Sequence, residues 1–379
     1  MTPFDFQLRA RVVFGAGTID RLAELGGEFG FRRTLLVADP GLVEAGHVAR
    51  VTTLLDAAGI AVFPFHDFDP DPDTDAIETA RAFAAPHAVD SIVGLGGGSS
   101  MDCAKGANFL LTNGGRMHDY RGFGKTTRPM LPSIGVPTTA GTGSEAQVWA
   151  VIADAATHMK MTCGAPQSAF RAALLDPELT LSQPAAVTAV TGFDAIAHAV
   201  ESYVTSRRTP MSTCFAREAW RLLTGAYPGV LADPTDGEAR SAMLLGAHYA
   251  GMAIDQSMLG AAHACANPLT AHHGVTHGRA LAVLLPHVVR WNATEVAPLY
   301  AELLTVVDRP TSAQDAGAAL AGYIQELAAA DLPTSLGDVG VAEPDVAALA
   351  REAAEQMTGR FNPRPFDAGA AEEIYRCAQ

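Results

Sequence analysis

The segment 191–204, TGFDAIAHAVESYV, places an acid and a base four residues apart in an otherwise apolar stretch. At helical spacing, Asp194 and His198 would lie on the same face. Burying a carboxylate or an imidazole without a partner is costly, so a further group must compensate for both. A divalent cation is one such group, and carboxylate plus imidazole suits Fe²⁺ or Zn²⁺ better than Mg²⁺.

A histidine-rich segment further along the chain could complete such a site. It spans residues 259–287 and contains His263, His272, His273, His277 and His287. A single buried histidine more often hydrogen-bonds locally, so metal binding is indicated by the set and not by any one member. The two segments lie about 60 residues apart, and on spacing alone both interpretations stay open.

A glycine-rich loop, GGGSSMDCAK at 96–105, follows a short apolar run at 91–96. Glycines allow a backbone to approach a bulky anion closely, and the next helix would offer free N–H groups and a positive dipole end. Ser99 and Ser100 could add hydroxyl donors. The pattern favours a phosphate-binding loop, although glycine clusters also occur in turns shaped only for packing.

The position of Asp39 differs from the usual dinucleotide pattern. In the usual pattern, the acid that binds the ribose follows the glycines by about 20 residues. Asp39 instead precedes the glycines, at the end of the run 33–39. Asp39 could bind an adenosine ribose and repel a 2′-phosphate, which would favour NAD over NADP. The alternative is that it caps the following helix.

A second polar loop, PTTAGTGSE at 137–145, follows another expected strand. Its threonines and serine could supply small donors to a ligand, although such composition also makes ordinary loops. Two loops of this kind at the ends of neighbouring parallel strands would support each other as parts of one site.

Apolar runs alternate with helical periodicity in the first half of the chain, which predicts a covered parallel sheet. Expected strands lie at 33–39, 61–65, 91–96, 130–139 and 171–176, with helices at 41–59, 74–85 and 101–115. After about residue 182 only helical periodicity remains. Expected helices there are 184–206, 211–227, 237–254, 279–293, 296–307, 312–330, 343–358 and 368–377. We therefore expect domains at 1–182 and 183–379.

Composition argues against several classes of function. The net charge of −15, without a Lys/Arg cluster, argues against nucleic-acid binding. No apolar run reaches the roughly 18 residues of a membrane span, and the N-terminus lacks the pattern of a signal peptide. Five cysteines without a CxxC pair are typical of reduced thiols. We expect a soluble cytoplasmic protein with neither nucleic-acid nor membrane partners.

Five motifs together resemble the iron-containing (group III) alcohol dehydrogenase family, of the dehydroquinate synthase-like fold: GGGSSMDCAK, PTTAGTGSE, TGFDAIAHAVESYV, PLTAHHGVTHG and LLPHVVRWN. The resemblance implies an α/β plus all-α chain: an N-terminal Rossmann-like parallel-sheet domain and a C-terminal helical, metal-binding domain, with the active site between them. It implies a metal-dependent oxidoreductase that transfers hydride between NAD(H) and an alcohol/aldehyde pair. It also implies a homo-oligomer.

The resemblance further assigns residues to the site. Metal ligands fall on Asp194, His198, His263 and His277, which would hold Fe²⁺, with Zn²⁺ as the alternative. NAD is expected as the cofactor in preference to NADP. The residues expected to contact it are Asp39, Gly96, Gly97, Gly98, Ser99, Asp102, Thr138, Thr139, Thr142 and Lys160.

One departure from the family pattern concerns the proton route. Asn267 stands where the family usually has a histidine proposed to relay protons. A neutral amide cannot act as a general acid or base near pH 7. His272 or His273 could replace it beside His277 as catalytic groups, or water could serve.

Two further departures concern the substrate pocket. Asp71 and Asp73, in DPDPDT, replace a common Asn-Pro-Thr, and AIDQS at 253–257 replaces a Phe-Ser-Asn type segment. The family's substrates therefore do not transfer to this chain.

Other functions stay open at this point. A metal- and NAD-dependent lyase or cyclase of the same fold would use NAD transiently and release no NADH. A glycerol-dehydrogenase-like zinc enzyme would be a nearer relative. A non-catalytic nucleotide-binding relative would explain Asn267, but it would have no reason to keep four metal ligands.

Overall fold

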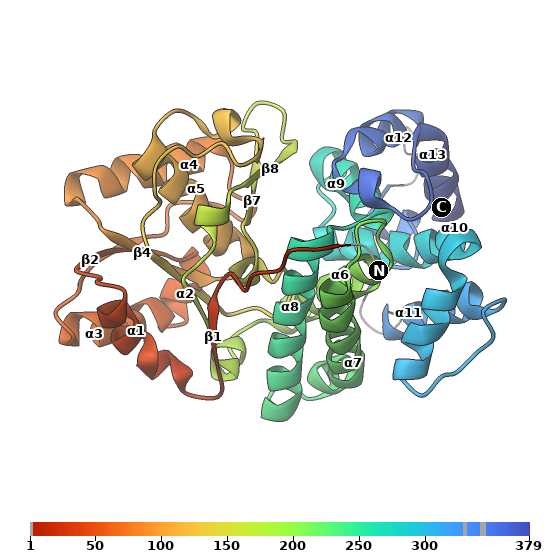
Figure 1. Cartoon of the computed structure of the whole chain (residues 1–379), viewed down its shortest axis with the longest axis horizontal. Helices are drawn as coiled ribbons and strands as arrows, with labels where there is room; N and C mark the ends of the chain where they lie inside the picture. Colours follow the sequence, from red (N-terminus) through yellow and green to blue (C-terminus); the bar gives the residue numbers. More distant parts are fainter. Residues whose placement is uncertain (1–2, 329–331, 342–345) are drawn as a thin grey trace. The chain divides into compact units, whose positions relative to one another are not determined.

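Two units of different architecture make up the chain in this computed structural model, which describes residues 3–328, 332–341 and 346–379 (Figure 1). One unit spans Gln7–Gln183. The other spans Pro184–Gln379 and takes in the described residues before Gln7, which sequence reasoning had assigned to the first domain. The expected combination of an α/β unit and an all-α unit is confirmed.

The first unit is built on a six-stranded sheet in the order β1-β9-β6-β4-β2-β3, and all neighbouring strands are parallel. The strands are β1 (Arg11–Phe14), β2 (Arg33–Val37), β3 (Ala61–Phe65), β4 (Ser91–Gly96), β6 (Ser133–Pro137) and β9 (Ala172–Leu175). Strand β1 was not predicted, because three of its four residues are exposed at the sheet edge and no buried run marks it.

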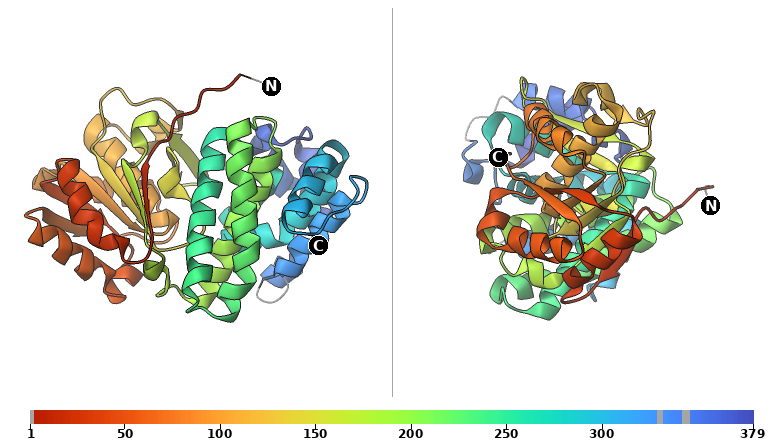
Figure 2. Two further views of the ribbon diagram at one scale, coloured as in Figure 1. Left: turned by 60° about the horizontal axis from the view of Figure 1, so that its bottom comes forward. Right: turned by 90° about the vertical axis from the view of Figure 1, so that its left-hand side faces the viewer.

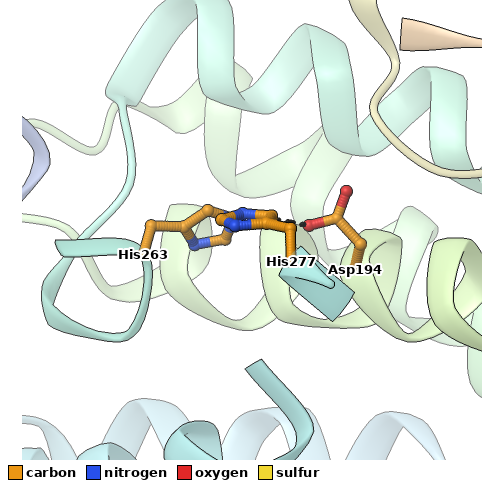
Figure 3. Close-up of side chains that lie close together, drawn as sticks. All are labelled: Asp194, His263 and His277. Atoms are coloured by element: carbon orange, nitrogen blue, oxygen red, sulfur yellow. Dashed lines mark ion pairs between the residues drawn. The ribbon is translucent and has the colours of Figure 1, made fainter. Parts of the chain in front are cut away.

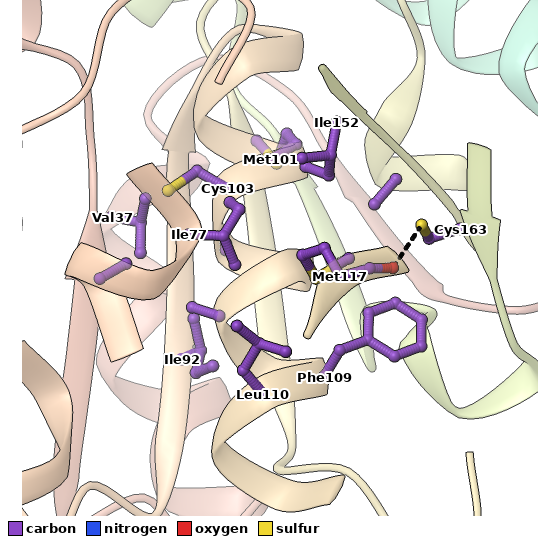
Figure 4. Packing of buried hydrophobic residues seen from close by; sticks show 14 of the residues in the cluster. Val37, Ile77, Ile92, Met101, Cys103, Phe109, Leu110, Met117, Ile152 and Cys163 are labelled. Atoms are coloured by element: carbon purple, nitrogen blue, oxygen red, sulfur yellow. Dashed lines mark hydrogen bonds between the residues drawn. The ribbon is translucent and has the colours of Figure 1, made fainter. Parts of the chain in front are cut away.

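Both faces of this sheet carry apolar cores, because successive residues of a strand point to opposite faces. Leu35 and Val37 belong to one core and Leu36 to the other. Helices α4 (Thr74–Ala84) and α5 (Gly98–Asn113) contribute to the first core, part of which Figure 4 shows. Helices α1 (Leu22–Glu28) and α3 (His47–Ala57) contribute to the second. This packing holds the carboxyl ends of the strands, and the loops that follow them, in place.

A helix expected over residues 41–59 is divided in two. Helix α2 (Pro40–Glu44) ends before Gly46, and α3 starts at His47. Gly46 has φ 81°, a left-handed conformation that glycine adopts readily and that no α-helix continues through.

A second, three-stranded sheet in the first unit was not predicted. Its order is β5-β8-β7, with β5 (Gly122–Phe123), β7 (Trp149–Ala153) and β8 (Lys160–Gly164). Two of the strands pair antiparallel across a polar turn. Strand β5 has only two residues and β8 mixes polar and apolar residues, so neither stands out from the loops around it, and the apolar run of β7 was overlooked.

The second unit is helical, and the described residues after Pro184 form no strand. Its helices are α6 (Ala185–Val204), α7 (Pro210–Ala232), α8 (Gly237–Ser257), α9 (Ala261–His273), α10 (His277–Val306), α11 (Ala316–Ala328), α12 (Val346–Glu355) and α13 (Ala368–Cys377). Helices α7 and α8 run side by side, as Figure 1 and the left view of Figure 2 show. Helix α6 packs against α7, α8 and α10 and is buried over most of its length.

Most of these helices lie where periodicity predicted them. The two segments expected at 279–293 and 296–307 are the halves of α10, which is kinked at Val296 (φ −129°). Residues 329–330 and 343–345 of two expected helices lie outside the described residues. Helix α9 was missed, because the polar residue His263 lies on its buried face and its middle contains Pro268. None of the helices in the described ranges has the length and apolar character of a membrane span.

Candidate cofactor and metal sites

The glycines at the carboxyl end of β4 leave no room for side chains. A Cβ atom at Gly96, which has φ 141°, would lie 2.3 Å from Oγ of Ser100. A Cβ at Gly98 would lie 2.6 Å from Cγ2 of Thr142. Gly97 is the N-cap of α5, and none of the described side chains caps the helix there. The first N–H groups of α5 can therefore bind an anion.

The second polar loop lies directly beside these glycines. Strand β6 is the parallel neighbour of β4, and the N–H of Thr138 donates to the carbonyl of Gly96 (3.0 Å). A Cβ at Gly97 would lie 3.2 Å from the side chain of Thr139. The structure thus brings Thr138, Thr139 and Thr142 to the glycine-rich loop, as expected if both loops belong to one site.

Asp39 follows β2, the other neighbour of β4. The strand order reverses between these two strands, since β3 lies on one side and β6 on the other. Open α/β sheets bind ligands at such a switch point, outside the carboxyl ends of the strands. Oγ of Ser100 donates to the Asp39 carboxylate (3.3 Å), and that carboxylate makes no capping bond to α2. Asp39 is the N-cap residue of α2 by position, but its carboxylate does not cap that helix, so the carboxylate is available for the cofactor role, which stays a prediction.

A hollow of about 290 Å³ lies next to this edge of the sheet. Its lining includes Pro40, which follows Asp39, and aspartates of the segment after β3: Asp67, Asp69, Asp71 and Asp73. Clustered carboxylates give the hollow a negative potential, which disfavours an additional anion.

Asp102 and Lys160 lie near the start of α5. The Asp102 carboxylate accepts hydrogen bonds from Oγ of Ser144 (2.8 Å) and from the N–H of Val151 (3.2 Å). Burial raises the pKa of Asp102 to about 6, and the ammonium groups of Lys105 and Lys160 oppose that rise. Lys160 is the first residue of β8, and its role in cofactor binding stays a prediction.

Four side chains of the helical unit meet around one carboxylate oxygen. Oδ1 of Asp194 lies 3.2 Å from Nε2 of His198, 3.5 Å from Nε2 of His263 and 3.9 Å from Nε2 of His277. One ligand atom each from Asp194, His263 and His277 lies within 4.8 Å of the others (Figure 3). His198 lies outside this tightest group, and its ring stacks on that of His263.

Three helices supply these residues. Asp194 and His198 lie on one face of α6, His263 lies in the first turn of α9, and His277 is the first residue of α10. A Cβ on the next residue, Gly278, would lie 2.2 Å from the carbonyl oxygen of Val190 in α6. Glycine therefore allows α10 to approach α6 closely enough for His277 to reach Asp194.

The buried atoms of this group suit a divalent cation. The side chains of Asp194, His198 and His263 are all less than 10% exposed. Within the described ranges, Oδ1 of Asp194 and Nε2 of His263 have no hydrogen-bond partner. Burial would raise the pKa of Asp194, but the imidazoles of His198, His277 and His263 hold it well below its usual value. An ionised carboxylate beside imidazole nitrogens is the donor set that Fe²⁺ and Zn²⁺ accept.

Sequence reasoning missed Glu201, which contacts His263 on the side away from Asp194. Its Oε2 lies 2.5 Å from Nδ1 of His263, and its Oε1 accepts the N–H of Ala262 (2.7 Å). Since a carboxylate accepts hydrogen bonds, the contact places the imidazole proton on Nδ1 and leaves Nε2 free to bind a metal. The signal was present in the sequence, because residues 194, 198 and 201 share one helical face.

His272 and His273 do not join the ligand group. Both lie in the last turn of α9 and are exposed, and Nε2 of His272 lies 2.6 Å from a carboxylate oxygen of Glu352. At 1.5 Å per residue, His272 is about 13 Å along the helix axis from His263. A direct role beside the ion is therefore not supported by their positions, and their catalytic role stays a prediction.

Asn267 is tied to a neighbouring segment. Its side-chain amide donates to Oε1 of Gln356 (3.0 Å), just after α12. The residue that replaces the family's proposed proton relay thus makes a structural hydrogen bond.

The chain is similar to known proteins over nearly its whole length. A family model described as iron-containing alcohol dehydrogenase matches residues 9–177, and one for the C-terminal part of the family matches residues 188–379. The NAD-dependent methanol dehydrogenase of Bacillus methanolicus is 33% identical over 360 residues, covering 93% of each chain. Lactaldehyde reductase of Escherichia coli (strain K12) is 31% identical over 372 residues, covering 96% of this chain and 97% of that protein.

A solved structure, that of 1,3-propanediol oxidoreductase, matches over 100% of both chains with a TM-score of 0.96 and 32% identity. Sequence motifs, fold and site geometry lead to one conclusion. The chain belongs to the iron-containing alcohol dehydrogenase family.

Proposed function

We propose that this protein catalyses metal-dependent hydride transfer between NAD(H) and an alcohol/aldehyde pair. The observation that carries the proposal is the convergence of His198, His263 and His277 on Oδ1 of Asp194. It is supported by the glycine-rich loop at the switch point of the parallel sheet. Similar proteins are named for reactions of small alcohols and aldehydes, such as methanol and lactaldehyde.

The residues that would hold the metal are Asp194, His198, His263 and His277. Fe²⁺ is the ion we propose, and Zn²⁺ would accept the same three imidazoles and carboxylate. The ion would supply a Lewis acid for the substrate oxygen. Asp194 contributes the negative charge that favours a dication in a buried site. His277 is the most exposed of the four side chains, at 23%, and marks the side that a substrate could reach.

The residues that would hold the cofactor lie around the start of α5. We propose that the glycine-rich loop and the free N–H groups of α5 bind the pyrophosphate, with Asp102, Thr138, Thr139, Thr142 and Lys160 nearby. NAD would supply the hydride acceptor and donor. Asp39 would accept hydrogen bonds from the adenosine ribose. Asp39 and the aspartate-lined hollow beside it both oppose a 2′-phosphate, so we propose a preference for NAD over NADP.

Proton exchange needs a route that avoids Asn267. Its amide is held by Gln356 and cannot transfer a proton near pH 7. We assign the exchange to water on the exposed side of His277.

We also propose that the protein is a homo-oligomer. Strand β1 is at the edge of the six-stranded sheet, where one side pairs with β9, and Val12 and Phe14 are 40% and 42% exposed. An open strand edge with apolar side chains is suited to pairing with a second copy. The cytoplasmic location stays a prediction.

The test is a substrate screen on metal-stripped protein after addition of Fe²⁺ or Zn²⁺. Short alcohols and aldehydes would be assayed with NAD(H) and with NADP(H). A steady change in NADH absorbance supports the proposal. Substrate turnover without net NADH formation would instead indicate a lyase or cyclase, and nucleotide binding without any turnover would indicate a non-catalytic relative.

A further inference from the structure

An ion pair lies at the start of the helix assigned to the pyrophosphate. Nζ of Lys160 is 2.9 Å from Oδ1 of Asp71, and the lysine side chain is 17% exposed. The backbone N–H of Asp71 donates to Oγ of Ser99 (3.0 Å), the second residue of α5. The pair is therefore attached to the first turn of α5 by a direct hydrogen bond.

The backbone holds the Asp71 carboxylate in this place. Asp71 has φ 57°, a left-handed conformation that Asp, Asn and Gly tolerate better than other residues. Prolines on both sides, Pro70 and Pro72, restrict the neighbouring backbone further. The Asp71 side chain is 57% exposed, but it extends from a constrained backbone that directs it toward Lys160.

The charge of Asp71 opposes the proposed ligand. A pyrophosphate is anionic, and both the N-terminus of α5 and the ammonium of Lys160 attract it. Asp71 forms an ion pair with that ammonium and brings a negative charge to the same place. Three other aspartates of the same segment, Asp67, Asp69 and Asp73, line the adjoining hollow and add to the negative potential. The ammonium of Lys160 also favours the ionised form of Asp102 in α5, against the effect of burial on the pKa of that carboxyl.

We propose that Asp71 sets the affinity for the dinucleotide, because it holds Lys160 in an ion pair and thereby weakens cofactor binding and speeds its release. This inference rests on the proposed cofactor site. The protein would gain rapid exchange of NAD and NADH between turnovers, since differences in affinity within one binding site are mostly differences in dissociation rate.

The test is a titration of the full-length protein with NADH, followed by its fluorescence, for five variants and the parent. Asp71→Asn keeps the tolerated backbone conformation and the N–H bond to Ser99 but releases Lys160. We expect its Kd for NADH to fall about fivefold at low salt, with a slower dissociation rate, and the gain to shrink at high salt. Asp71→Gly, which also accepts this conformation, should give the same result.

Lys160→Met should raise the Kd about fivefold, because it leaves the Asp71 carboxylate uncompensated. The double variant Asp71→Asn/Lys160→Met removes both charges and should return to within about twofold of the parent. Asp56→Asn is the matched control. Asp56 is exposed near the end of α3, which leads to the amino end of β3, whereas the proposed cofactor site lies at the carboxyl ends of the strands. Its Kd should not change.

An unchanged or higher Kd for Asp71→Asn would overturn the inference. So would a double variant as weak as Lys160→Met, because Lys160 would then contact the cofactor without interference from Asp71. A parent protein that does not bind NADH would overturn the cofactor assignment itself, which separates the two failures.

Discussion

Oε2 of Glu201 lies 2.5 Å from Nδ1 of His263, while the other oxygen of the same carboxylate accepts the N–H of Ala262. Glu201, a buried residue of α6, thus orients the imidazole of His263 and also accepts a hydrogen bond from a backbone N–H in the first turn of α9, the helix that carries His263. Such a contact from a carboxylate to a ligand histidine fixes the tautomer and increases the basicity of the nitrogen that faces the metal.

Glu201→Gln is expected to weaken metal binding about 10- to 100-fold, because glutamine keeps the size of the side chain but not its charge. Chelator competition followed by metal analysis measures this loss. NADH binding should not change. Glu295→Gln, at an exposed position on α10, is the matched control. If metal affinity stayed at the level of the parent protein, Glu201 would serve only the start of α9.

Gly278→Ala is expected to displace His277 from the ligand group, because the new Cβ would meet the carbonyl oxygen of Val190 at 2.2 Å. Metal content and dehydrogenase activity should both fall at least about tenfold, with NADH binding retained. Gly322→Ala makes the same change in α11, where the new Cβ would meet no described atom within 4 Å apart from its own helix backbone, and it should be neutral or slightly stabilising. Full activity in Gly278→Ala would show that α10 can shift without loss of the site.

Asp39→Ala is expected to change the choice of cofactor. On the proposed assignment, removal of the carboxylate would take away an acceptor for the ribose of NADH and a repulsive charge for the 2′-phosphate of NADPH. The ratio of kcat/KM for NADPH to that for NADH should rise at least about tenfold. Asp56→Ala, which removes the same charge at a distant position, controls for net charge. A ratio that did not move would remove Asp39 from the cofactor site.

The pKa of Asp102 predicts a pH-dependent contribution to stability. Folding raises this pKa from 3.8 to about 6, with burial as the main cause, so the folded protein favours the protonated carboxyl. Its stabilising contribution is complete below the unfolded pKa and is lost as the pH rises through about 6. Relative to Asp102→Asn, the free energy of unfolding should fall by about 1–3 kcal/mol between about pH 4 and pH 7. Denaturant titrations at several pH values measure the difference, and a constant difference would contradict the assignment.

Local patterns in the sequence were sufficient to predict much of the fold and part of the site. Strand β4 is a fully buried apolar run, and the glycines after it marked the loop at the end of the strand. The spacing of Asp194 and His198 depends on a single helix, so helical geometry alone indicated that they share a face. The assignment of His263 and His277 came from family resemblance, because no local pattern connects α9 and α10 to α6.

The parts that sequence did not predict depend on contacts between distant segments. Glu201 acts on His263, but that contact exists only because α9 starts beside α6. The need for glycine at position 278 is not visible in the sequence, because it arises from the close approach of Val190 in α6. Helix α9 itself was missed partly because His263, a proposed metal ligand, lies on its buried face, where an apolar residue would otherwise help to reveal the helix.

The most direct test of the metal assignment is the metal content of His263→Ala, measured together with NADH binding on the same samples. The parent protein should hold about one Fe²⁺ or Zn²⁺ ion per chain after reconstitution. His263→Ala should hold less than about a tenth of that, while its Kd for NADH stays within about twofold of the parent value. Full metal retention in the variant, or an equal loss of metal and NADH binding, would contradict a metal site built by the helical unit alone.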